Sequence, residues 1–104
     1  MSKSEFDVLK EEIRAFAQAR HWEQFHTPKN LAMAITGEAG ELAAEFQWLT
    51  AQQSELQALS DEQLEAIALE IADVQIYLLR LADTLGVDVP AVVRKKLEIN
   101  ESRF

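Results

Sequence analysis

Residues 61–85, with the sequence DEQLEAIALEIADVQIYLLRLADTL, are the stretch that decides the fold. Ser60 and Gln63 have the spacing of a capping box at its start, and Gly86 follows it as the residue type that most often ends a helix. Its apolar residues cover more of the helix circumference than one neighbouring helix can bury. The stretch therefore predicts a long central helix over 61–85, with protein on most of its sides.

Three further helices are expected around this one, because apolar residues elsewhere recur at helical spacing and no segment has the alternation typical of a strand. Capping residues and prolines mark where each should begin. These helices are predicted from Ser4 to about Arg20, from Thr27-Pro28 to Leu49 or Thr50, and from Asp88 and Pro90 to Ile99. The chain is therefore expected to be all-α, a four-helix bundle that forms a single domain over residues 1–104.

Composition limits the class of protein. The chain has 104 residues, no cysteine and a net charge of −8. Without thiols it has neither disulfides nor a zinc–thiolate site, and its negative charge opposes binding to polymeric nucleic acid, which needs a basic surface. No apolar run approaches the roughly 20 residues that span a bilayer, and the first residues lack the apolar core of a secretory signal. We therefore expect a cytoplasmic protein without nucleic-acid or membrane partners.

Two acid pairs lie beside the apolar stripes of the second and third predicted helices. Glu38-x-x-Glu41 and Glu70-x-x-Asp73 each place two carboxylates on one helical face, since residues three apart are neighbours on a helix. Clustered carboxylates repel one another, and a divalent cation that prefers oxygen ligands, such as Mg²⁺, removes that penalty. The pairs predict a metal site between the two helices. The alternative is that these acids are solvated surface charges.

An aromatic residue continues each acid stripe. Trp48 follows Glu41 by seven residues, and Tyr77 follows Asp73 by four. This pattern is typical of a site that holds a charged group at one end and a planar ring at the other. The alternative is that both aromatic side chains belong to the core.

The acid pairs belong to longer motifs, which are Gly37-Glu38-Ala39-Gly40-Glu41-Leu42-Ala43, Glu70-Ile71-Ala72-Asp73-Val74 and Tyr77-Leu78. Together these motifs closely resemble those of the MazG-like all-α nucleoside triphosphate pyrophosphohydrolases. The resemblance is greatest to the dCTP pyrophosphatase branch, where three further segments recur in the same order: Arg20-His21-Trp22-Glu23-Gln24-Phe25-His26, Phe46-Gln47-Trp48 and Lys96-x-x-x-Asn100. It covers nearly the whole chain, from Glu12 to Arg103.

The resemblance implies Mg²⁺-dependent hydrolysis of (deoxy)nucleoside triphosphates, dCTP preferred, to the monophosphate and pyrophosphate. The catalytic residues would be the metal ligands Glu38, Glu41, Glu70 and Asp73, with Mn²⁺ as an alternative ion. One of these acids, with Glu41 preferred, would accept the proton of the attacking water. The residues that would hold the nucleobase are Trp22, Phe25, His26, Trp48 and Tyr77, and those expected to hold the phosphates are Lys29, Lys96, Asn100 and Arg103.

Two other functions remain open at this point. One is a related hydrolase of dUTP or of phosphoribosyl-ATP, against which the segment Trp22-Glu23-Gln24-Phe25-His26 argues. The other is a non-catalytic, metal-binding module for helix oligomerisation.

Assembly follows from the apolar character of the central helix, which is too apolar all round for a monomer. The resembling branch forms tetramers built as dimers of dimers. We therefore expect a homotetramer that completes the bundle, with the loop over residues 22–26 reaching toward a neighbour's acid pairs.

Overall fold

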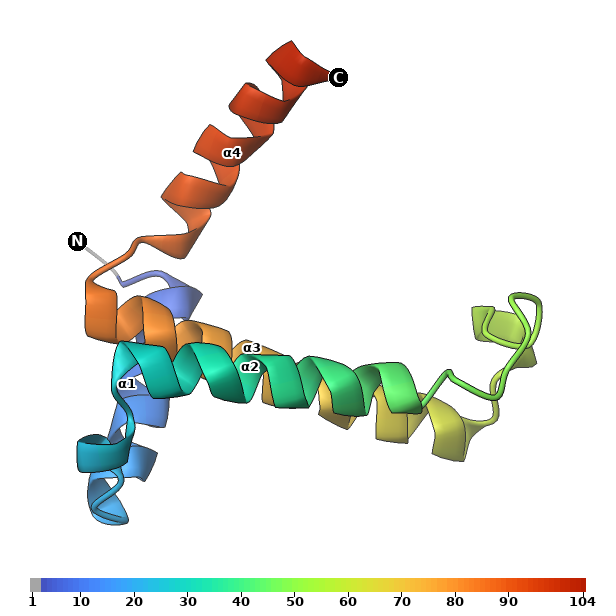
Figure 1. Cartoon of the computed structure of the whole chain (residues 1–104), viewed down its shortest axis with the longest axis horizontal. Coiled ribbons are helices and arrows are strands. Elements are labelled where there is room, and N and C mark those ends of the chain that lie inside the picture. Colours follow the sequence, from blue (N-terminus) through green and yellow to red (C-terminus); the bar gives the residue numbers. More distant parts are fainter. Residues whose placement is uncertain (1–2) are drawn as a thin grey trace.

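Four α-helices make up most of the structure, a computed structural model that describes residues 3–104 (Figure 1). They are α1 (Glu5–Ala19), α2 (Pro28–Ala44), α3 (Asp61–Leu85) and α4 (Val89–Arg103), with the short 3₁₀ helices η1 (Glu23–Phe25) and η2 (Leu56–Ala58) in the connections. No strand occurs within residues 3–104, and the prediction of an all-α protein is confirmed.

Each α-helix begins at a residue whose side chain accepts a hydrogen bond from the backbone. At α3 both bonds of the predicted capping box form: the Ser60 hydroxyl accepts from the Gln63 N–H at 3.0 Å, and the Gln63 side chain accepts from the Ser60 N–H at 2.9 Å. Gly86 ends this helix with a φ of 65°, in the left-handed region that glycine tolerates. The other three N-caps are Ser4, Thr27 and Asp88, where the sequence predicted them.

The end of α2 differs from the prediction. The helix stops at Ala44 instead of reaching Leu49 or Thr50. The Thr50 hydroxyl accepts from the Gln53 N–H at 3.1 Å, and the Gln53 side chain accepts from the Thr50 N–H at 2.9 Å. This is a further capping box, and a residue in the N-cap position has non-helical backbone angles. Before Thr50, the N–H groups of Phe46 and Leu49 donate to carbonyls three residues back, as in turns, and the local bonds of Thr50 keep this residue out of any continuation of α2.

The helices pack as one antiparallel pair with a third helix across it. α2 and α3 lie side by side and run in opposite directions, and α1 packs across the C-terminal half of α3 (Figure 1). The core where these helices meet is small, and its buried apolar side chains are Ala17, Leu31, Ile67, Leu79 and Ala82.

α4 extends away from the other three helices and has no buried residue (Figure 1). It also continues to Arg103, past the predicted end at Ile99, because no glycine or proline follows to stop it. The four predicted helices are confirmed, and within one chain three of them pack while the fourth projects. Completion of the bundle by oligomerisation stays a prediction.

The chain exposes more surface than a compact monomer of its mass. Its accessible surface is 7980 Å², whereas a compact 11.8 kDa protein exposes about 5,900 Å². Its radius of gyration is 16.3 Å, against about 13 Å for a compact chain of this length. Leu69 and Ile71 of α3 are 57% and 48% exposed, and Leu97 of α4 is 62% exposed. The sequence predicted that α3 is covered by protein on most sides. Within one chain it is not, because α1 and α2 cover only part of its circumference.

Within residues 3–104 no helix is both long enough and apolar enough to cross a membrane.

Candidate functional site

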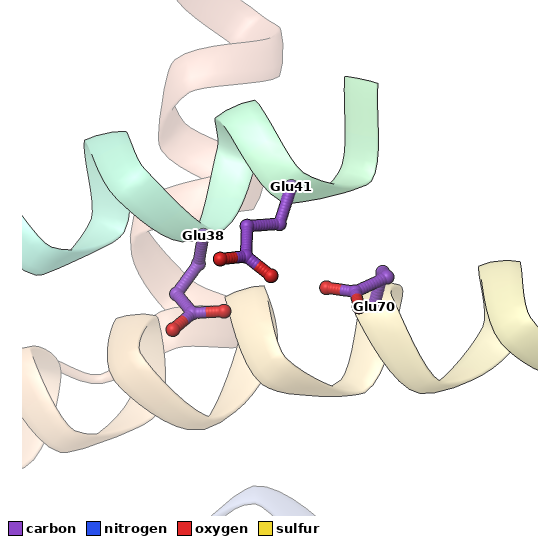
Figure 2. Close-up of side chains that lie close together, drawn as sticks. All are labelled: Glu38, Glu41 and Glu70. Carbon is purple, nitrogen blue, oxygen red and sulfur yellow. The ribbon is translucent and has the colours of Figure 1, made fainter. Parts of the chain in front are cut away.

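Three glutamates meet where α2 and α3 lie side by side. Glu38 and Glu41 are one turn apart on α2 and project toward α3, and Glu70 of α3 projects toward them (Figure 2). One carboxylate oxygen from each residue lies within 4.8 Å of the other two. We call these residues the three-acid group. The spacing of three along α2 and the packing of the two helices together produce this arrangement.

The electrostatics of the three-acid group are unfavourable without a cation. Burial, and after it the charges of Asp73 and Glu41, raise the pKa of Glu38 above its ordinary value. The pKa of Glu70 is raised by burial first, and then by the charges of Glu41, Asp73, Glu38 and Glu45. The Glu70 Oε2 atom is buried and has no hydrogen-bond partner among residues 3–104. No salt bridge in the described part of the chain reaches the group. A buried, unpartnered carboxylate oxygen among other carboxylates fits a hard divalent cation.

Asp73, the fourth predicted ligand, lies beside the three-acid group without joining it. Its charge raises the pKa of Glu38 and of Glu70. Its side chain lines a neighbouring pocket together with Tyr77, one turn further along α3. Metal ligation by Asp73 therefore stays a prediction, and this residue connects the acids to the pocket.

This pocket lies between α1, α3 and the loop after α1, and has a volume of about 220 Å³. We call it the aromatic pocket. Its lining residues are Ile13, Phe16, Ala17, Trp22, His26, Asp73, Ile76, Tyr77 and Arg80. The Trp22 ring meets the Phe16 ring edge to face, with centroids 5.7 Å apart, and its centroid lies 6.1 Å from that of His26. Trp22 and His26 thus line a pocket together with Asp73 of their own chain. The expected reach of this loop toward a neighbour stays a prediction.

Six predicted substrate-binding residues do not line the aromatic pocket. Trp48 lies in the turns after α2 and is 86% exposed, and Phe25 is 61% exposed. Lys29 is exposed in the first turn of α2. Lys96, Asn100 and Arg103 are on α4, which extends away from α2 and α3 (Figure 1). One chain therefore does not bring the predicted phosphate-binding residues to the acids.

Sequence reasoning missed the wall that α1 contributes. Ile13 and Phe16 recur at helical spacing, but a core position and a pocket position have the same spacing. It also missed Arg80 as a pocket residue, although Arg80 follows Tyr77 by three residues on α3 and therefore shares its face.

Known proteins with similar sequences and structures support one family. A model of the MazG-like family matches residues 33–103. The chain is 46% identical over 89 residues to dCTP pyrophosphatase 1 of Homo sapiens and 44% identical over 89 residues to that of Bos taurus. These alignments cover 86% of this chain but 52% and 53% of the relatives, so the chain spans about half the length of the curated relatives it matches.

A solved structure, that of a pyrophosphatase from Archaeoglobus fulgidus, is similar over 100% of this chain and 95% of its own length. The TM-score is 0.88 and the sequence identity 36%. The family model alone covers more than half of the 104 residues. The chain belongs to the MazG-like family.

Proposed function

We propose that this chain hydrolyses nucleoside triphosphates, dCTP preferred, between the α and β phosphates to give the monophosphate and pyrophosphate. The observation that carries the proposal is the three-acid group, with its buried and unpartnered Glu70 oxygen, beside a pocket lined by aromatic rings. This arrangement suits a substrate with a polyphosphate at one end and a planar base at the other. The names of the similar proteins, dCTP pyrophosphatase 1 and a pyrophosphatase, support the same reaction. The cytoplasm as its location stays a prediction from composition.

The acids of the site would hold Mg²⁺, or Mn²⁺ in its place. Glu38, Glu41 and Glu70 would be its ligands, with Asp73 as a further oxygen donor. Such a cation, when bound, neutralises the triphosphate and lowers the pKa of the attacking water. The packing of α2 on α3 holds the carboxylates together against their mutual repulsion. Glu41 is exposed, so it has access to the water, and we assign to it the acceptance of the water's proton.

The aromatic pocket would hold the nucleobase. Trp22 and Tyr77 supply rings on which a base can stack, and stacking is worth about 1–3 kcal/mol per base in nucleic-acid-binding proteins. Asp73 lines this pocket and lies beside the three-acid group, so a base in the pocket would have its phosphates directed to the acids.

The proposal includes assembly into a homotetramer, a dimer of dimers. The chain exposes about 2,000 Å² more than a compact monomer, which is about what two interfaces of standard size remove from one chain. Trp48, which is 86% exposed, and α4, which extends away from α2 and α3, would then contribute to a neighbour's site. From α4 these contributions would be Lys96, Asn100 and Arg103.

A product assay tests the proposed reaction. With Mg²⁺ and a panel of dCTP, dTTP, dUTP, dATP, dGTP and phosphoribosyl-ATP, we expect pyrophosphate and a monophosphate, released fastest from dCTP. Glu41→Gln should lower turnover more than about 100-fold, because it removes both a ligand charge and the proton acceptor. Glu65→Gln, an exposed glutamate on α3 outside the three-acid group, is the matched control and should keep full activity.

Each other outcome has a definite meaning. Orthophosphate as the sole small product would show that the wrong bond is assigned. Preference for dUTP or phosphoribosyl-ATP would favour the related hydrolases, and a profile blind to the base would remove only the preference for dCTP. Mg²⁺ binding without any hydrolysis would favour the non-catalytic module.

A further inference from the structure

A chain of polar contacts runs from α1 across α3 to the wall of the aromatic pocket. Arg14 of α1 donates two hydrogen bonds to the Asp83 carboxylate, from Nε at 2.8 Å and from Nη2 at 2.6 Å. Arg80 Nη1 donates to the same carboxylate at 3.3 Å, and Arg80 Nε donates to His26 Nδ1 at 3.2 Å. We call Arg14, Asp83 and Arg80 the clamp.

The clamp is held more firmly than a surface ion pair. Arg80 is buried, with 7% of its surface exposed, and the Asp83 side chain is 13% exposed. The hydrogen bonds from Arg14 lower the pKa of Asp83, so this carboxylate stays ionised at neutral pH. A buried guanidinium between an ionised carboxylate and an imidazole has little freedom to turn, because each alternative orientation leaves a charged group unpaired.

The hydrogen bond that Arg80 Nε donates to His26 Nδ1 determines the tautomer of His26. A guanidinium only donates, so His26 Nδ1 must accept and cannot carry a proton. The neutral ring then carries its single proton on Nε2. Burial, and after it the charge of Arg80, lower the pKa of His26, which agrees with a neutral ring. The polar atom that His26 retains for a ligand is therefore a fixed Nε2–H donor.

We propose that the clamp positions His26 as an obligatory Nε2–H donor in the wall of the aromatic pocket, and that this donor selects a base whose edge presents acceptors. Cytosine presents two adjacent acceptors, O2 and N3, whereas uracil and thymine carry a hydrogen on N3. Because O2 is an acceptor in all three pyrimidines, the discriminating contact is the one to N3. A fixed donor facing N3 is satisfied by cytosine and meets an N–H in uracil and thymine. Arg80 and Asp83 are thus positioning residues for base selection. This inference rests on the proposed function in one respect, that the pocket takes the base.

The tautomer can be measured without turnover. The chain has two histidines, and His21 is exposed, so the ¹⁵N spectrum of the imidazole rings contains two ring systems of which one is an internal reference. At pH 7.5 the expected His26 pattern is an unprotonated Nδ1 and a protonated Nε2. Arg80→Met, which keeps an unbranched apolar stem, should produce a mixture of both tautomers. A proton on Nδ1 in the parent protein would overturn the proposal.

Base selection is measured by titrating dCMP and dUMP while following the His26 Nε2 shift. In the parent, dUMP should need about tenfold more nucleotide than dCMP, the effect of one neutral hydrogen bond. Arg80→Met should bring the two affinities together by weakening dCMP binding. Equal affinities in the parent, or no response of His26 to either nucleotide, would overturn the proposal. Pyrophosphate release is measured separately, so loss of the proposed reaction would be seen independently of these results.

Matched variants separate positioning from stability. Lys10 also connects α1 to the end of α3, through a hydrogen bond to the Val87 carbonyl, and it is equally buried. Lys10→Met therefore removes a comparable contact. The charge of Lys10 acts on Asp83, but less than that of Arg14 or Arg80, and Lys10 donates no hydrogen bond to the clamp or to His26, so this variant should leave both the tautomer and the preference for dCMP unchanged. If Arg80→Met does not fold, Asp83→Asn weakens the hold on Arg80 with little change of shape and should shift both readouts in the same direction. If a clamp variant mixes the tautomers of His26 while its preference for dCMP over dUMP stays tenfold, the proposed role of His26 in base selection is also refuted.

Discussion

Single residues of the site set how stability depends on pH. Burial, and after it neighbouring acids, raise the pKa values of Glu38 and Glu70 above the ordinary value of 4.5. The folded state therefore binds these protons more tightly than the unfolded state. Their contribution to stability is fully present below the unfolded pKa and is lost as pH rises through the folded values.

We therefore predict that the thermal midpoint of the metal-free protein falls as pH rises from 4.5 toward 7. Scanning calorimetry in EDTA measures this dependence, and Glu38→Gln should reduce it. Added Mg²⁺ should restore the midpoint at pH 7. Asp83, whose pKa is lowered by Arg14, acts in the opposite sense but below 3.8, outside this range. His26, whose pKa is lowered from 6.5 by burial and then by Arg80, also acts in the opposite sense and inside this range, so the difference between the parent and Glu38→Gln isolates the contribution of the acids. An identical pH profile in the parent and in Glu38→Gln would show that repulsion among the clustered acids is not the cause of this pH dependence.

His21 has backbone strain that can be relieved. It follows the end of α1 with a φ of 57°, where the Trp22 N–H donates to the Ala17 carbonyl at 3.0 Å. This position of a helix end favours glycine, because a side chain in the left-handed region costs about 1 kcal/mol. His21→Gly should therefore raise the free energy of unfolding by about 1 kcal/mol in denaturant titrations. His21→Ala keeps the strain and is the control; equal gains in both variants would show that strain is not the cause.

Among the site residues, the sequence allowed prediction of those that local geometry determines. Glu38 and Glu41 share a face because they are three residues apart, whatever the rest of the fold does. The contact between Arg80 and His26 was beyond reach, because it joins residues 54 positions apart through the packing of two helices. The half-buried Asp83 likewise has the sequence surroundings of an exposed acid near a helix end, and only its partner on α1 distinguishes it.

At the scale of whole elements, the connection after α2 is the segment to test. The capping box of Thr50 and Gln53 supplies side-chain partners to two backbone N–H groups of this connection. Thr50→Val removes the hydroxyl at constant shape and should lower the free energy of unfolding by about 1 kcal/mol at fixed protein concentration. Thr36→Val, an exposed threonine within α2, is the control and should change it by less than about 0.5 kcal/mol. No difference between the two variants would remove the reason given for the early end of α2.

Helix starts were easier to predict than helix ends. Ser4, Thr27, Ser60 and Asp88 cap helices through bonds to residues three positions later, so each start is visible within four residues of sequence. The direction of α4 depends instead on how the short connection after Gly86 is oriented. The absence of packing between α4 and the other helices had no sequence signal, because an exposed Leu97 and a buried one occupy the same kind of helical stripe.

The whole molecule is predicted to be an assembly. We expect sedimentation equilibrium to give about 47 kDa, four times the 11.8 kDa chain, because an isolated chain leaves its apolar α3 and α4 faces in water. Leu97→Glu places a charge on the apolar face of α4 and should lower the mass. Gln57→Glu adds the same charge at an exposed polar position and should not. A stable monomer with full activity would refute assembly, and a dimer would refute the four-chain form alone.

Shared sites predict complementation between inactive chains. Glu70→Gln removes an acid, and Trp48→Ala removes a ring that is 86% exposed in its own chain and is proposed to complete a neighbour's site. In a two-fold pair made of one chain of each kind, one site has both defects and the other has neither. Random co-assembly of these variants should therefore restore about a quarter of the parent activity, measured with dCTP below its KM.

Trp22→Ala is the matched partner for this experiment, because Trp22 lines a pocket with Asp73 of the same chain. Co-assembled with Glu70→Gln, it leaves one site without its acid and the other without its own Trp22. No site is then complete, and the mixture should not exceed the sum of the separate activities. If Trp48→Ala gives rescue and Trp22→Ala does not, each site takes Trp48 from the neighbouring chain and Trp22 from the chain that supplies the acids. Rescue by Trp22→Ala instead would mean that the loop over residues 22–26 crosses to the neighbouring chain in the assembly.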